Sequence, residues 1–233
     1  TGEDYWALQK RIVEFVCECW QEPDEGIWEV RDRRRHFVLS KVMAWVAVDR
    51  AVRAVERFGR EGPVERWRDV RDAIREEVME KGYDQDRGHF IRAYDDPSLD
   101  AALLMLPLVG FIEATDPRMR ETIEAIEREL VVDGFVQRYT ADDGLPPGEG
   151  AFLMCTLWLA NAMVLIGRAG DCRKYFERVL SVANDVGLLA EEYDVRLGRL
   201  VGNFPQAFSH TALVATAVAL ETGGDTSVVH RER

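Results

Sequence analysis

The chain has 233 residues, of which 47% are hydrophobic and 31% are charged, a composition typical of one large globular domain or two small ones. Its 42 acidic and 30 basic residues give a net charge of -12, and no basic run offsets that charge over a nucleic-acid footprint. We therefore expect no binding to DNA or RNA. No run of 18 apolar residues occurs, so we expect no membrane-spanning helix.

Apolar spacing predicts eight helical segments of two alternating kinds. Segments with a single apolar stripe span residues 5–20, 64–81, 118–130 and 171–184. Segments that are apolar on two sides or nearly all round span residues 37–58, 98–112, 151–166 and 206–221. A one-sided helix fits an outer ring, whereas a two-sided helix must be covered on both faces and fits an inner ring.

The connections between these segments alternate in length as well. The links after the two-sided segments are short, at 59–63, 113–117 and 168–170. The links after the one-sided segments are long, at 21–36, 82–97, 131–149 and 185–205. Short links are typical of αα-hairpins, and long irregular ones usually carry function. The period of roughly 55 residues predicts an all-α fold, an α/α toroid with its long loops on one face. A short β segment is predicted only at Gly88–Tyr94.

The four cysteines all fall inside helical patterns, and no group of cysteine and histidine has the spacing of a zinc site. We predict that they are reduced core residues of a cytoplasmic protein, with no metal and no cofactor. The chain opens on Thr1 rather than on Met, so we expect the native N-terminus to be absent.

Two glutamates occupy matching positions in the first and last long loops, Glu29 and Glu191. Hydrolysis of an acetal with inversion needs one carboxylic acid to protonate the leaving oxygen and one carboxylate to activate water, about 6.5–9.5 Å apart. The two loops become neighbours when a ring closes, so this pair predicts a glycosidase. The alternative interpretation is that both glutamates are solvated loop residues of an acidic protein.

Residues near these glutamates offer contacts for a sugar. Trp28 and Tyr193 present apolar faces with a polar handle, which suits stacking on a sugar ring. Arg138 and Tyr139 place donors in the third long loop. Arg31 begins a basic run that is either a solvated loop or part of a site lined by acids. We predict that all five residues bind the substrate.

The local sequence of several segments resembles that of glycoside hydrolase family 15, the glucoamylase-like enzymes. These segments are residues 24–31, 36–45, 100–104, 116–118, 148–152, 187–194 and 202–210. The similarity covers almost the whole chain, in order. It implies a six-hairpin α/α toroid, of which residues 1–233 supply about four of six helix pairs. The chain would then be a partial catalytic domain, helices five to twelve of the family pattern, with the N-terminal part missing.

The resemblance implies inverting hydrolysis of terminal α-linked glucose. The family's general acid follows a Trp in the loop after the fifth helix, which matches Glu29 after Trp28. Its general base stands in the pattern Glu-x-Tyr-Asp near the eleventh helix, which favours Glu191, with Glu192 as the competing candidate.

Two further positions bear on the substrate. The family's sugar-binding loop after the ninth helix carries an Arg-Tyr pair, which matches Arg138 and Tyr139. Val30 stands where fungal glucoamylases have a second acid that binds the next sugar. That departure shifts the resemblance towards bacterial and archaeal members, which include trehalases as well as glucoamylases.

We therefore predict a hydrolase of terminal α-linked glucose in oligo- or polysaccharides, with Glu29 as acid and Glu191 as base. Two alternatives stay open: a trehalase of the same family, and a non-catalytic sugar-binding or structural fragment. The expected partners are an α-glucoside and, for the apolar faces of an incomplete ring, either the missing N-terminal segment or a second copy of the chain.

Overall fold

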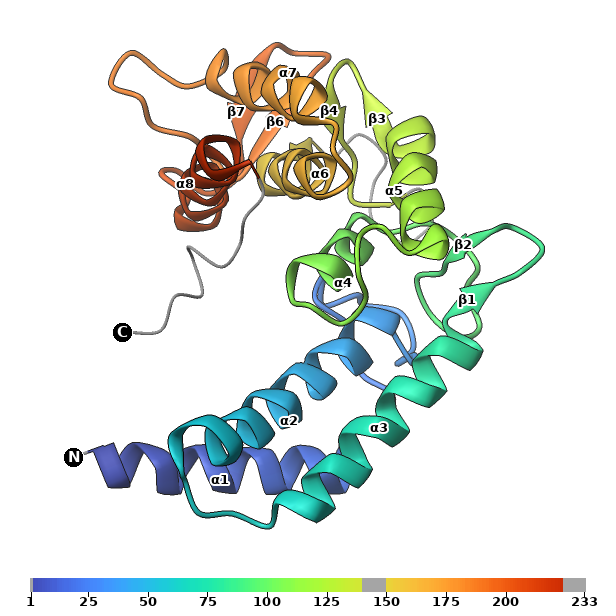
Figure 1. The fold of residues 1–233 in the computed structure, drawn as a ribbon. Coiled ribbons are helices and arrows are strands. Elements are labelled where there is room, and N and C mark those ends of the chain that lie inside the picture. The colour runs from blue at the N-terminus through green and yellow to red at the C-terminus, as the bar shows by residue number, and fades with distance from the viewer. Residues whose placement is uncertain (1, 140–149, 224–233) are drawn as a thin grey trace. The chain divides into compact units, whose positions relative to one another are not determined.

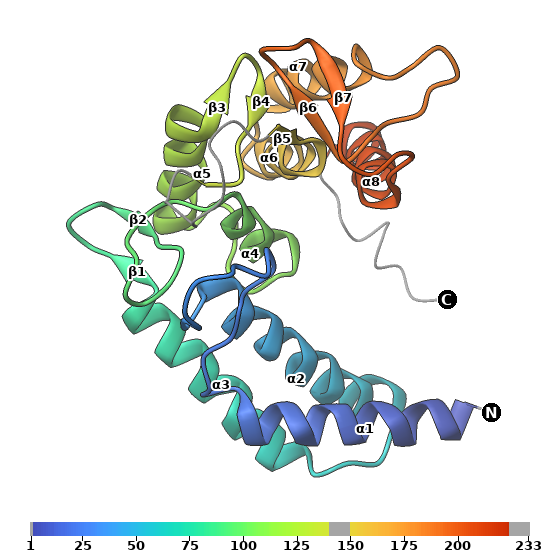
Figure 2. The same cartoon turned by 180° about the vertical axis from the view of Figure 1, so that it is seen from behind.

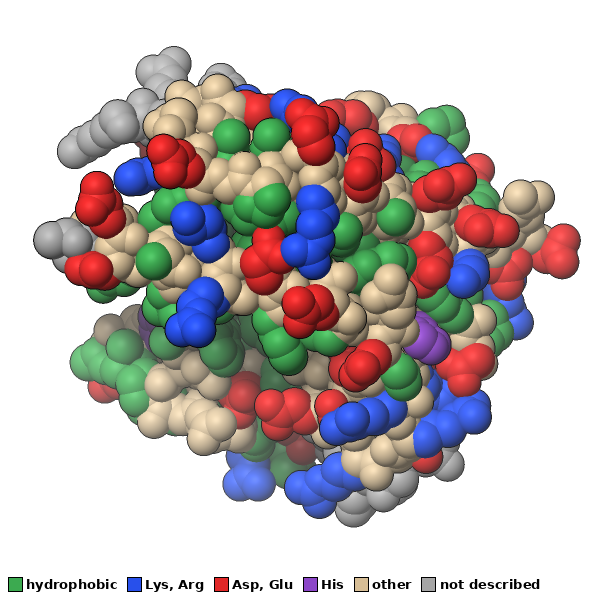
Figure 3. All heavy atoms as spheres, turned by 90° about the horizontal axis from the view of Figure 1, so that it is seen from below, with side chains coloured by type: hydrophobic (Ala, Val, Ile, Leu, Met, Phe, Trp, Pro, Cys, Tyr) green, Lys and Arg blue, Asp and Glu red, His purple; other side chains and the backbone are tan. Residues whose placement is uncertain are grey.

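The computed structural model describes residues 2–139 and 150–223, which form two compact units within residues 1–97 and 98–233 (Figure 1). None of the described helices is both long enough and apolar enough to cross a membrane. All four cysteines are free thiols. Acidic and basic side chains are intermingled over the face drawn in Figure 3, which gives this face no continuous basic surface.

The first unit is built from three helices and one hairpin. The helices are α1 (Gly2–Cys19), α2 (Val38–Phe58) and α3 (Val64–Lys81), and the hairpin pairs β1 (Tyr83–Asp84) with β2 (His89–Phe90). Helix α2 packs along α3 and also against α1, as both ribbon views show (Figures 1 and 2). Strand β2 lies within the short β segment predicted at Gly88–Tyr94, whereas its partner β1 lies before that segment and was not predicted.

Helix α2 forms the core of this unit through the face that carries its valines and Trp45, whereas its second apolar face is only partly buried, with Met43 44% exposed. Val38, Val42, Val48 and Val52 on α2 are all fully buried. Trp67 on α3 is also fully buried, and its Nε1 donates to Glu14 Oε1 of α1 at 2.8 Å. This one side chain therefore links the outer two helices of the unit.

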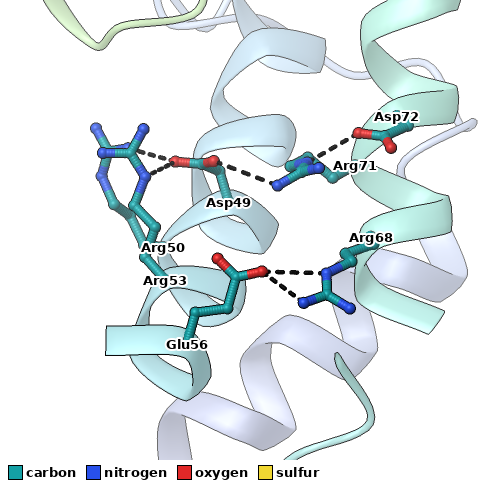
Figure 4. Close-up of polar contacts among 7 residues, drawn as sticks. All are labelled: Asp49, Arg50, Arg53, Glu56, Arg68, Arg71 and Asp72. Carbon is teal, nitrogen blue, oxygen red and sulfur yellow. Dashed lines mark hydrogen bonds and ion pairs between the residues drawn. The ribbon is translucent and has the colours of Figure 1, made fainter. Parts of the chain in front are cut away.

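An ionic network joins the polar faces of α2 and α3 (Figure 4). The buried carboxylate of Asp49 forms ion pairs with Arg50 at 2.6 Å, with Arg53 at 2.8 Å and, across the helix pair, with Arg71 at 3.9 Å. Two turns further along α2, Glu56 pairs with Arg68 at 2.7 Å.

Helix α1 differs from its predicted one-sided character. Val13 and Cys17 are buried, whereas the predicted stripe is open to solvent, with Leu8 56%, Ile12 52% and Phe15 65% exposed. The prediction that α1 buries a single stripe was therefore wrong. The helix has a second, shorter apolar face, formed by Val13 and Cys17, and this is the face that is buried within the unit.

The second unit is arranged around α6 (Leu153–Leu165), which is buried nearly all round. The helices that accompany it are α5 (Pro117–Leu130), α7 (Ala169–Leu180) and α8 (Ala207–Thr222), preceded by the short η1 (Ala101–Leu104) and α4 (Met105–Leu108). Helices α7 and α8 pack against α6 and against each other, and α5 also packs against α6 (Figure 1). The broad apolar character of residues 151–166 correctly predicts this central position.

Short antiparallel strands complete the second unit. Strand β3 (Val131–Val132) pairs with β4 (Phe135–Val136), and β5 (Ala151–Phe152), β6 (Glu192–Asp194) and β7 (Arg199–Val201) form a sheet in that order. These strands were not predicted, because elements of two or three residues are too short to show an alternating pattern.

The predicted helix over residues 98–112 is also wrong in extent. Only a 3-10 turn and one turn of α-helix form there. Pro107 has no N–H to donate to the carbonyl of Leu103, so one continuous α-helix cannot run from residue 98 through it, although the first turn of α4 tolerates a proline. Asp100 starts the 3-10 turn by accepting a hydrogen bond from the backbone N–H of Ala102 at 2.7 Å.

The network of Figure 4 predicts unequal stability losses. Asp49→Asn removes the buried charge that three arginines share and is expected to lower the free energy of unfolding by about 2 kcal/mol. Glu56→Gln is the matched control, since its side chain is 42% exposed and such pairs contribute about 0–1 kcal/mol. Urea unfolding of the two variants checks the order, and equal losses would contradict it.

Candidate active site

The loop between α1 and α2 is closed at its base by two backbone hydrogen bonds. The N–H of Asp24 donates to the Arg35 carbonyl at 3.0 Å, and the N–H of Arg35 donates to the Asp24 carbonyl at 2.9 Å. We call residues 24–35 the acid loop, after the candidate acid at its tip. The tip is a turn in which the N–H of Glu29 donates to the Gly26 carbonyl at 3.2 Å.

Glu29 has a left-handed backbone conformation, with φ 49°. Among the described residues only Asp133 shares this property without being a glycine. A left-handed conformation costs a residue with a Cβ atom about 1–2 kcal/mol, and such strain gathers at functional sites. The Glu29 side chain is exposed to solvent, so no burial requirement accounts for a glutamate here.

The acid loop has a small apolar core of its own. Val30, Phe37 and Ala93 are buried together, and Trp28 packs against them while remaining partly exposed. Gly26 is needed beside this core, because a Cβ atom there would lie 2.9 Å from the Phe37 ring. Trp28 and Glu29 are therefore neighbours in a loop that has one packed arrangement.

The basic run of the acid loop is tied down by ion pairs. Arg33 pairs with Asp95 at 2.6 Å, Arg34 pairs with Glu25 at 2.7 Å, and Arg35 also pairs with Asp95, at 3.1 Å. Arg31 is exposed at the start of the run, close to Glu29 in the chain. Its contact with substrate stays a prediction.

Glu191 lies directly before β6, and both its backbone and its carboxylate form hydrogen bonds. Its Oε2 accepts from the backbone N–H of Asn203 at 3.2 Å and from the Asn203 side-chain amide at 2.9 Å, and its Oε1 accepts from the Gln206 amide at 3.3 Å. A Cβ atom at Gly202, where φ is 78°, would lie 3.0 Å from the Glu191 side chain. The amides and the glycine together fix the orientation of the carboxylate.

Glu192, the competing candidate for the base, has a different environment. Its carboxylate lies over Gly150, where an added Cβ atom would be 2.9 Å from Glu192 Oε2. Tyr193 follows on β6, and its ring packs against Phe135 with a centroid distance of 5.0 Å. Tyr193 is thus half-buried against the core of its unit, and stacking of this ring on a sugar stays a prediction.

Arg138 and Tyr139 lie where β4 leads towards residues 140–149. The Arg138 side chain is buried, with its guanidinium 5.0 Å from the Tyr139 ring centroid and 4.8 Å from that of Phe152. Tyr139 bridges to Asp100 through its backbone. The neighbouring acidic residues Asp142 and Asp143 lie outside the described residues.

The predicted site residues divide between the two units. Trp28, Glu29 and Arg31 belong to the first, and Arg138, Tyr139, Glu191 and Tyr193 belong to the second. Asn203 and Gln206, which bind the Glu191 carboxylate, have no role assigned from the sequence. The sequence signal for them is the presence of two amide side chains in the four residues that precede the apolar helix α8.

Comparison with known families finds a match over almost the whole chain. The model of glycosyl hydrolases family 15 matches residues 2–218. The chain belongs to this family. Its place in family 15 confirms the resemblance inferred from the sequence.

Curated relatives within the family are trehalases. The chain is 46% identical over 219 residues to a trehalase of Mycobacterium tuberculosis (strain ATCC 25618 / H37Rv), covering 93% of this chain and 32% of that protein. It is 41% identical over 217 residues to a trehalase of Thermoplasma volcanium, covering 93% of this chain and 35% of that protein. The chain thus spans about a third of the length of the curated relatives it matches.

Solved structures confirm the fold. A glycosidase in complex with glucose matches with a TM-score of 0.78 at 20% identity, covering 90% of this chain and 58% of that one. A glucoamylase from Saccharomycopsis fibuligera matches with a TM-score of 0.77 at 12% identity, covering 91% of this chain and 60% of that one. The family 15 chain therefore has the predicted all-α, α/α-toroid fold.

The backbone of Glu29 predicts an unusual order of stability. Glu29→Gly removes the Cβ atom that the left-handed conformation disfavours, so Glu29→Gly should be more stable than Glu29→Ala by about 1 kcal/mol. Thermal or urea unfolding of the two variants measures the difference. The same pair of substitutions at Glu25, on the same loop without a positive φ, is the control and should show the opposite order.

Proposed function

We propose that this family 15 chain carries the catalytic carboxylates of a trehalase, which hydrolyses α,α-trehalose with inversion. The observation that supports trehalose most is the 46% identity to a trehalase over 93% of the chain. The glucoamylase likeness is one of fold, at 12% sequence identity. The trehalase alternative is therefore preferred to the hydrolysis of longer glucans, and Val30 in place of a second acid agrees with it.

In this mechanism Glu29 is the general acid and Glu191 the general base. Glu29 gives its proton to the glycosidic oxygen as the bond to the anomeric carbon breaks. Glu191 accepts a proton from the water that attacks that carbon from the opposite face. The amides of Asn203 and Gln206 hold the Glu191 carboxylate so that a fixed oxygen faces the water.

Substrate contacts are proposed for the remaining predicted residues. Trp28 keeps part of its ring exposed beside Glu29, which suits stacking on the sugar that receives the proton. Arg31 is exposed on the same loop and offers donors to hydroxyl groups. Arg138, whose guanidinium stacks on the Tyr139 ring, and Tyr193 on β6, two residues after Glu191, are proposed to contact the sugar on the side of the base.

A partner for the open apolar faces is also proposed. Leu8, Ile12 and Phe15 on α1 are each more than half exposed, as is Phe208 on α8 at 65%. Faces of this kind pack against further residues of the same polypeptide or against a second copy of the chain. The cytoplasmic location stays a prediction that rests on the free cysteines.

The two catalytic roles predict different substrate dependence. In the complete gene product, Glu29→Gln and Glu191→Gln should each lower kcat for trehalose by about 10²- to 10⁴-fold. α-Glucosyl fluoride has a leaving group that needs no proton, so Glu29→Gln should retain much of its activity on the fluoride and Glu191→Gln should not. Glu192→Gln is the matched control and should remain active on both substrates. Wild-type turnover of trehalose by Glu191→Gln would refute the assignment of the base.

The stereochemistry and the substrate range give an independent test. Inversion at one anomeric carbon of trehalose releases one β-glucose and one α-glucose, which proton NMR distinguishes before mutarotation. Trehalose should be cleaved much faster than maltose or a maltodextrin. Preferred cleavage of the maltodextrin would restore the glucoamylase-like interpretation, and two α-glucose products would exclude inversion.

A further inference from the structure

Lys41 is a buried lysine that the proposed mechanism does not use. Its side chain lies in the first turn of α2 and is almost fully buried, at 3% exposed. The ammonium donates to the carbonyl of Trp20 and to that of Glu22 at 2.7 Å, where the chain leaves α1. Burial lowers the pKa of Lys41, the sign of a desolvated ammonium.

The residue before Lys41 holds the same stretch of chain by a second contact. Ser40 Oγ donates to Asp24 Oδ1 at 3.0 Å, and the same oxygen accepts from the N–H of Gly26 at 3.0 Å. Asp24 is also one partner of the backbone pair that closes the acid loop. Consecutive residues of α2 therefore fix the chain at positions 20, 22 and 24.

The other end of the acid loop reaches the same helix turn. Arg35 pairs with Asp24, and after it the chain runs through Phe37 into α2, whose first N–H, that of Val38, donates to the Arg92 carbonyl at 3.0 Å. Both ends of the acid loop are thus attached to the N-terminal turn of α2. The tip that carries Glu29 has its position set by that attachment.

We propose that Lys41, assisted by Ser40, is a positioning residue that holds the acid loop so that Glu29 reaches the glycosidic oxygen. This inference rests on the proposed function of Glu29. If Lys41 served only to cap the C-terminus of α1, its contact with the carbonyl of Trp20 would be sufficient. The contacts to Glu22 and, through Ser40, to Asp24 lie beyond the helix and act on the loop.

Two variants in the complete gene product test the proposal. Lys41→Met keeps an unbranched side chain that matches the apolar part of lysine and removes the ammonium donors, and Ser40→Ala removes only the hydroxyl. Lys41→Met should lower kcat for trehalose by about 10- to 100-fold with little change in KM, because a small misplacement of a catalytic group has effects of this size. Activity on α-glucosyl fluoride should fall far less, since that substrate needs no proton from Glu29. Ser40→Ala should show the same pattern with a smaller loss.

Asp49→Asn is the matched control, because it destabilises the same helix at a site remote from the acid loop. Its kcat per folded molecule should equal that of the wild type on both substrates. Equal losses on trehalose and the fluoride in Lys41→Met, or no loss on trehalose, would overturn the proposal. If Lys41→Met does not fold, Ser40→Ala decides the question by the same comparison of substrates.

A readout that needs no activity separates this inference from the proposed function. The acid loop carries the exposed residues Arg31, Arg33 and Arg34, so trypsin can cut it when it opens. Native-state cleavage in this loop should be several-fold faster in Lys41→Met than in the wild type or in Asp49→Asn. Unchanged cleavage would refute the attachment even in an active enzyme. Faster cleavage in a protein that does not hydrolyse trehalose would retain the attachment and reject the proposed function.

Discussion

A helix that is apolar on more than one side has to be covered on each of them, and the two units of this chain are built around two such helices. Helix α2 organises the first unit and α6 the second. Neither has a side-chain cap at its first turn. The first N–H of α2 donates to the carbonyl of Arg92, and the first N–H of α6 donates to the carbonyl of Glu191, at 3.0 Å each. Loop carbonyls therefore satisfy donors that would otherwise remain unpaired.

This arrangement connects the core to the candidate site. Glu191 is held through its own carbonyl by the start of α6, and the acid loop is held by Ser40 and Lys41 at the start of α2. Each carboxylate is thus placed relative to the most extensively buried helix of its unit. Sites supported in this way keep their geometry better than sites on unattached loops.

The sequence predicts those parts of the molecule that depend on long-period patterns. Helices α2, α3, α5 and α8 lie within a residue or two of their predicted bounds, because an apolar face that recurs over three or more turns is a strong signal. The strands around Glu191 escape prediction because each has two or three residues. The exposed stripe of α1 escapes it because a pattern shows that a face is apolar but not what covers it.

The candidate site likewise contains residues that the sequence reveals and residues that only the folded structure reveals. Glu29 and Glu191 can be found from the loops in which they lie and from the family's sequence motifs, because a motif depends only on residues that are neighbours in the chain. The left-handed backbone of Glu29 and the amides of Asn203 and Gln206 around Glu191 come from contacts within folded loops, so spacing alone does not reveal them. Lys41 is harder still to find, because a lysine in the first turn of a helix is ordinarily expected to be solvated.

The strain at Glu29 has to be offset by the rest of the acid loop. A left-handed glutamate costs about 1–2 kcal/mol, and a glycine would avoid that cost. The loop contains enough compensating contacts, with its closed base, its apolar core around Phe37 and the ion pairs to Asp95. A glutamate retained where glycine fits better, on a loop this firmly held, is best explained by chemistry at its carboxyl group. The same reasoning accounts for the buried Lys41, because a rigid attachment is what keeps the strained tip in one conformation.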